Sequence, residues 1–91
     1  MRAYVLVEAL PGKAKQAARA IRQVDVPGVD ILSAEAVIGP FDVIVVLEVP
    51  DWETLGRAVS YGIQRAPGTK RTMSCLALPP SSARAARAAA A

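Results

Sequence analysis

The pattern of hydrophobic and polar positions divides the chain into short strands and helices, followed by an alanine-rich end. Runs of β-branched and apolar residues between turn formers are typical of strands, whereas apolar positions that recur every three or four residues are typical of helices. The pattern predicts four strands, at Ala3 to Ala9, Ile31 to Ile38, Phe41 to Val49 and Thr69 to Leu78. It also predicts two helices, at Lys13 to Val24 and from the N-cap Asp51 to the stop at Pro67 and Gly68.

This order, strand–helix–strand–strand–helix–strand, is that of the ferredoxin-like fold. We therefore predict an α+β domain with a four-stranded antiparallel sheet, of which the helices cover one face. Only Gly39 and Pro40 separate the two central strands, which predicts a tight hairpin. The segment from Phe41 to Val49 is apolar on both faces, so we expect a second subunit to cover the face that the helices leave open. A swapped strand or edge pairing between subunits is the alternative arrangement.

Candidate ligand-binding residues fall at one end of the predicted sheet. In the hairpin, Gly39 lets a ligand approach the main chain, Phe41 follows, and Asp42 can accept a hydrogen bond from an ammonium group. On the last strand, Thr72 and Ser74 share one face, and their hydroxyls can donate to a carboxylate or accept from an amine. The structural alternative is a tight turn that Asp42 closes, with two hydroxyls at a half-exposed strand end.

Other conspicuous side chains have structural interpretations. A basic face on the first helix is predicted to be solvated, and it carries Lys13, Lys15, Arg19 and Arg22. Arg71, near the start of the last strand, is expected to pair with a nearby carboxylate or an anion. Trp52 belongs to the apolar stripe predicted for the second helix, and Cys75 is predicted to be a small core residue.

Composition limits the chemistry that these residues can perform. The chain has no histidine and one cysteine, so histidine-dependent catalysis, an internal disulfide and a zinc knuckle are excluded. Neither a phosphate-binding loop nor a nucleophile elbow occurs, and we expect no enzymatic activity, no cofactor and no metal. No apolar run approaches the length of about 20 residues that a membrane span needs, so a cytoplasmic protein is predicted.

Charge is unevenly distributed between a predicted domain and a predicted tail. Residues 1–78 are expected to form one domain, and residues 79–91 a flexible, low-complexity tail. The net charge of +3 includes Arg84 and Arg87 in that tail, so the domain alone carries nine basic and eight acidic residues. A net charge of +1 gives little support to nucleic-acid binding, and direct DNA binding is not expected.

Several motifs in order resemble the effector-binding domain of the Lrp/AsnC regulators. They are G-P-F-D at Gly39 to Asp42, D-x-x-x-L-G from Asp51 to Gly56, and I-Q-x-x-P-G-x-x-R-T from Ile63 to Thr72. The resemblance implies a ferredoxin-like fold that dimerises through its sheets, and higher rings such as octamers. It also implies a small amino acid bound between dimers. By residue match, one wall of that cleft would carry Gly39, Phe41 and Asp42, and another Thr72 and Ser74.

The chain departs from the family pattern in two ways. Regulators of this type carry a helix-turn-helix module before the effector-binding domain, whereas here the predicted domain begins at residue 3. The chain therefore resembles stand-alone members, and its expected partners are itself, an amino acid and a full-length regulator. Pro40 also removes one turn N–H that a ligand carboxylate could use. The competing hypotheses are a dimeric α+β-barrel enzyme, such as a cofactor-free monooxygenase or isomerase, and a ligand-free structural adaptor.

Overall fold

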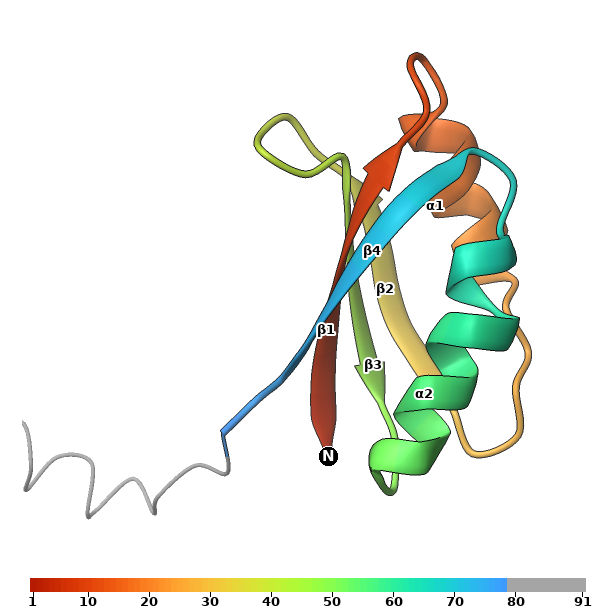
Figure 1. Ribbon diagram of the computed structural model, residues 1–91, viewed down its shortest axis with the longest axis vertical. Coiled ribbons are helices and arrows are strands. Elements are labelled where there is room, and N and C mark those ends of the chain that lie inside the picture. Colours follow the sequence, from red (N-terminus) through yellow and green to blue (C-terminus); the bar gives the residue numbers. More distant parts are fainter. Residues whose placement is uncertain (79–91) are drawn as a thin grey trace, which may run out of the picture.

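The computed structural model describes residues 1–78 and confirms the predicted order of elements (Figure 1). The elements are β1 (Arg2–Ala9), α1 (Ala14–Arg22), β2 (Asp30–Ala36), β3 (Val43–Glu48), α2 (Trp52–Tyr61), the 3-10 helix η1 (Ile63–Arg65) and β4 (Thr69–Leu76). The predicted tail lies outside the described residues. Except for α2, the bounds within residues 1–78 lie within two positions of the predicted ones. The helix predicted to continue to the stop at Pro67 and Gly68 instead ends at Tyr61, and η1 follows it as a separate 3-10 helix.

The four strands form one antiparallel sheet in the order β2-β3-β1-β4, so β2 and β4 are the edges. Both helices lie on the same side of this sheet (Figure 1). The other side is not covered by any part of residues 1–78, and we call it the open face. The chain is thus the predicted α+β plait, with a helical layer on a single sheet.

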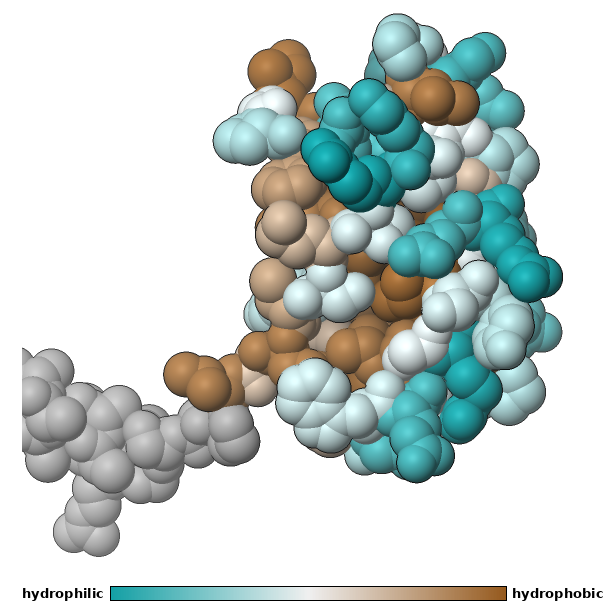
Figure 2. All heavy atoms as spheres, viewed as in Figure 1, coloured by the Kyte–Doolittle hydropathy of each residue, from teal (hydrophilic) through white to brown (hydrophobic). Residues whose placement is uncertain are grey.

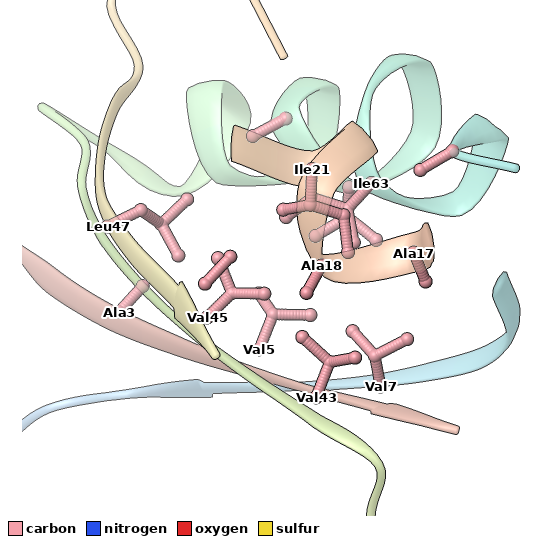
Figure 3. Close-up of a cluster of buried hydrophobic side chains, with 14 of the residues drawn as sticks. Ala3, Val5, Val7, Ala17, Ala18, Ile21, Val43, Val45, Leu47 and Ile63 are labelled. Atoms are coloured by element: carbon pink, nitrogen blue, oxygen red, sulfur yellow. The ribbon is translucent and has the colours of Figure 1, made fainter. Parts of the chain in front are cut away.

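The core lies between the helices and the sheet (Figure 3). Alternate residues of β1 and β3 are buried because successive side chains of a strand point to opposite faces. Small residues on α1 allow that helix to approach the sheet closely. The fully buried side chains include Val5, Val7, Val43, Val45 and Leu47 from the sheet, and Ala17, Ile21 and Ile63 from the helical layer.

Local features fix both ends of α2. Asp51 caps the helix as predicted, since its side chain accepts a hydrogen bond from the Thr54 N–H at 2.7 Å. Bonds from Thr54 hold the pKa of Asp51 below its ordinary value. At the other end, a Cβ on Gly62 would lie 2.5 Å from a methyl carbon of Val24 and 2.7 Å from the Ala58 carbonyl oxygen. Only glycine fits where the chain turns from α2 into η1.

Two predictions about individual side chains were wrong. Trp52 is 71% exposed, because Thr54, Leu55, Ala58 and Val59 form the buried side of α2. Cys75 is exposed, because it stands on the open face and not in the core.

The prediction of a tight hairpin at Gly39 and Pro40 was also wrong. The connection is a wider loop, residues 37–42, that the bond from the Val37 N–H to the Asp42 carbonyl closes at 2.8 Å. Gly39 does not adopt a backbone conformation that only glycine allows. Its φ is not positive, and a Cβ at that position would meet nothing within 4 Å.

Candidate functional site

The open face carries a continuous apolar patch over three strands. Register places Tyr4 of β1 beside Val46 of β3, and Leu6 between Ile44 and Met73. Tyr4 is 37%, Ile44 36% and Met73 55% exposed, which is high for large apolar side chains in a sheet. Figure 2 shows hydrophobic residues along the side of the molecule that faces away from the helices. An exposed apolar patch of this kind is typical of a surface that binds another protein.

Ion pairs stand at both ends of this patch. At one end the Arg71 guanidinium bonds the Glu8 carboxylate, with Nε at 3.0 Å, and the Lys70 ammonium lies 3.3 Å from the same carboxylate. At the other end Arg2 Nε lies 2.6 Å from Glu48. The bonds from Arg71 and Arg2 lower the pKa of Glu8 and Glu48 respectively, so both carboxylates stay charged at neutral pH. An apolar centre with a charged border is the usual anatomy of a protein interface.

A hollow of about 290 Å³ opens where the patch meets the first of these ion pairs. Phe41 of the β2–β3 loop and Thr72 of β4 both line it, so the structure unites two of the sequence-predicted site residues. The remaining lining comes from Glu8, Pro40, Arg71 and Met73. A carboxylate, a guanidinium and apolar side chains together are complementary to an amino acid, which carries an ammonium, a carboxylate and a side chain.

The other predicted site residues are near the hollow but do not line it. Asp42 clasps the loop onto β1, because its Oδ2 accepts from the Ala9 N–H at 2.9 Å and its own N–H donates to the Val7 carbonyl at 2.8 Å. Gly39 is exposed at the loop tip. Ser74 lies further along β4, opposite Val5.

Sequence reasoning missed Glu8, and the structure shows why. Glu8 looks isolated along the chain, but the register of β1 with β4 places it directly beside Arg71, 63 residues away. The pairing expected for Arg71 is therefore present. Thr72 is also engaged, because its hydroxyl accepts from Gln64 Nε2 at 3.1 Å. That bond orients the hydroxyl toward η1.

Residues 1–78 contain neither a cluster of metal ligands nor a membrane-spanning helix. No group of three or more cysteine, aspartate or glutamate side chains lies close enough there to hold a metal ion. Over the same residues, neither helix has the length and hydrophobicity needed to cross a membrane.

Comparison with known proteins places this fold beside transcription regulators. No family model and no curated protein matches the chain. Among solved structures, TTHA0845 from Thermus thermophilus is 26% identical with a TM-score of 0.75, over 88% of this chain and 95% of that one.

Two further structures are about twice as long as the matched region. AsnC of E. coli has a TM-score of 0.74 at 11% identity, over 87% of this chain and 51% of that one. The transcriptional regulator NMB0573 of Neisseria meningitidis, solved as an L-Met complex, has a TM-score of 0.69 at 20% identity over 86% and 49%. The resemblance to the Lrp/AsnC effector-binding domain is thus confirmed at the level of the fold.

Proposed function

We propose that this chain acts as an effector-binding and oligomerisation domain of the Lrp/AsnC type. It binds a small amino acid between copies of itself and so modulates a partner regulator of transcription. The observation that carries the proposal is the position of the hollow, which combines the Glu8–Arg71 pair with Phe41 and Thr72 at the border of the apolar open face. The solved L-Met complex of a regulator with the same fold supports an amino acid as the ligand class.

The first step of the proposal is dimerisation through the open face. Burial of Tyr4, Leu6, Ile44 and Met73 against a second copy removes apolar surface from water, which favours association by roughly 25 cal/mol for each Å². The hollow lies at the border of that contact. A neighbouring subunit there excludes water from the Glu8–Arg71 pair and strengthens its bonds to a ligand. Dimers assemble further into a ring such as an octamer.

The second step is capture of the amino acid by the loop and the start of β4. Gly39, Phe41 and Asp42 form one wall, and the ligand ammonium meets the Asp42 carboxylate oxygen that does not bond Ala9. On β4, Thr72 lines the hollow and Ser74 lies two residues further along the same, helix-facing side of the strand; their hydroxyls are the proposed partners of the ligand carboxylate. Arg71 lines the same hollow as Thr72 and supplies the charge that the hydroxyls lack.

The third step is a change in assembly. A ligand that contacts two subunits favours the association state in which both sets of contacts form, so its binding energy shifts the oligomer equilibrium. A regulator that co-assembles with this chain then experiences the same shift. The role is non-catalytic. The apolar side chains of Leu6, Ile44 and Val46 on the open face disfavour the polar interior that a barrel enzyme would need.

The test is a thermal-shift panel of the common amino acids, run beside light scattering on the full chain. A ligand present at about 100 times its Kd stabilises the fold by about 2.7 kcal/mol, which a melting curve resolves easily. We expect one amino acid or a few related ones to raise the melting temperature and to change the oligomer mass. A stable oligomer that responds to none of them would favour the ligand-free adaptor instead.

A further inference from the structure

A groove runs along the outer edge of β2, which is the edge of the sheet opposite to β4. Three adjoining hollows of about 440, 360 and 590 Å³ form it, because the first two share Arg22 and Glu35 and the last two share Lys15 and Ala36. One wall is α1 and the other is the β2 strand. Each hollow is larger than the 290 Å³ proposed for the amino acid. The groove therefore has room for a chain segment.

The backbone of β2 offers hydrogen-bonding groups to this groove. The Val37 N–H faces β3, since it donates to Asp42, and residues alternate along an antiparallel strand. Ala36 and Ala34 therefore direct their N–H and C=O groups outward. The Arg22 side chain confirms the direction, because its Nε donates to the outward Ala34 carbonyl at 2.9 Å. Such an edge is a template for an added strand.

The side chains of the groove indicate the chemistry of that strand. Lys15, Arg19 and Arg22 form a row of cations on the α1 wall, and Glu35 is the single carboxylate among the lining residues. None of the three cations makes an ion pair with any residue of the described part of the chain, 1–78. Cations without carboxylate partners favour an acidic occupant.

Exposed aliphatic side chains mark the two ends of the groove. Leu32 lines one end and is 45% exposed, and Ile38 lines the other and is fully exposed. A bound segment with an apolar residue at each end would remove both from water. Seven positions separate these ends, counting both, so the segment needs about seven residues in extended form.

We propose that the β2 edge is a docking site for an extended acidic peptide segment of a partner protein. The segment adds as a strand beside β2, with its backbone bonded to Ala34 and Ala36. Its carboxylates face Lys15 and Arg19. In the free protein the Arg22 guanidinium donates a hydrogen bond to the Ala34 carbonyl oxygen. A backbone N–H of the bound segment takes over this bond, and the guanidinium then pairs with a carboxylate of the segment. This site is separate from the amino-acid site, and peptide binding does not require that the amino acid be bound.

The probe is a fluorescent, end-blocked peptide of about seven residues that alternates valine and glutamate, measured by anisotropy on the full chain. We expect saturable binding that weakens as salt rises, because exposed ion pairs are screened. A second peptide carries lysine in place of glutamate. A third keeps the glutamates but is N-methylated on the residues of its bonding edge, which removes the donors that strand addition needs. We expect neither control peptide to bind.

Two variants test the two walls of the groove. Lys15→Glu combined with Arg19→Glu should weaken the acidic peptide by at least about tenfold, whereas Arg57→Glu combined with Arg65→Glu, an equal charge change away from the groove, should change affinity little. Ala36→Pro removes one outward N–H and leaves the pairing of β2 with β3, since proline is tolerated on an edge strand. It should abolish binding while the fold is retained.

Each of the following results would overturn the proposal. Equal binding of the N-methylated peptide shows that charge alone attracts the probe, and binding of the lysine peptide shows that charge is irrelevant. A poly-thymidine strand that binds through the same cations, with no binding of the acidic peptide, assigns them to nucleic acid. Loss of the wild-type oligomer in Ala36→Pro assigns the edge to a second copy of the chain. The peptide controls use wild-type protein, so they decide the matter even if a variant fails to fold.

Discussion

Asp42 is assigned two roles, one structural and one in ligand binding, and substitutions can separate them. Its Oδ2 bonds the N–H of Ala9, which is a buried residue at the end of β1. Asp42→Ala removes this acceptor and the carboxylate charge together. Asp42→Asn keeps an oxygen acceptor in nearly the same place and removes only the charge. The ligand ammonium, in contrast, needs the charge.

The size of the structural effect follows from the hydrogen bond. Leaving the Ala9 N–H without its acceptor costs about 1–3 kcal/mol, less where water reaches it. In a domain of this size each kcal/mol lowers the melting temperature by about 4–8 °C. We therefore expect Asp42→Ala to melt at least about 4 °C below wild type, and Asp42→Asn to melt close to wild type.

Calorimetric titration with the amino acid found in the thermal-shift panel measures the second role. Both variants should lose binding, while light scattering still finds the dimer, because Asp42 is not part of the apolar patch. The reasoning fails if Asp42→Ala melts with wild type, since the clasp would then contribute nothing. Retained amino-acid binding by a folded Asp42→Ala protein would remove Asp42 from the ligand site.

Three further predictions concern other parts of the molecule. Ile44→Lys places a charge at the centre of the open face and should convert the dimer to monomers, which light scattering detects. The circular dichroism of the helices should not change, and a persistent dimer would mean that the chains associate through another surface. Gly62→Ala should lower the urea midpoint strongly, because the added Cβ overlaps Val24 and a carbonyl; a wild-type midpoint would show that the turn relaxes freely. The pKa of Glu8 is lowered, mainly by the bond from Arg71, so the pair stabilises the fold above the unfolded pKa of glutamate, and this stability is lost as pH falls through the folded value. Glu8→Gln should therefore flatten the acid side of the stability curve measured by urea titration, and an unaltered slope would show that the pair contributes nothing.

The fold was predictable because its determinants are local. A few neighbouring positions of the sequence are enough to recognise each determinant. These are the alternation of buried residues in β1 and β3, the cap at Asp51, and the small residues on the buried side of α1. Trp52 was misplaced because helical spacing alone admits several apolar stripes. The sheet selects the one with Leu55 and Val59, which leaves the indole at the surface.

The candidate site was predictable only in part because it depends on strand register. Phe41 and Thr72 were expected at one end of the sheet from topology alone, and they do meet there. The pairing of Glu8 with Arg71 requires the alignment of β1 with β4, including the irregularity after Glu8, and no local pattern encodes it. The same holds for the role of Asp42, since its partner Ala9 is 33 residues away.

The loop of residues 37–42 connects the two proposed sites. Ile38 lines the end of the β2 groove, whereas Pro40 and Phe41 line the hollow proposed for the amino acid. The clasp at Asp42 and the bond across the loop base hold these residues in one short segment. If either ligand repositions the loop, thermodynamic linkage requires the amino acid to change the peptide's affinity by the same factor as the peptide changes that of the amino acid. A partner docked on β2 would then sense the effector even though it never touches the open face.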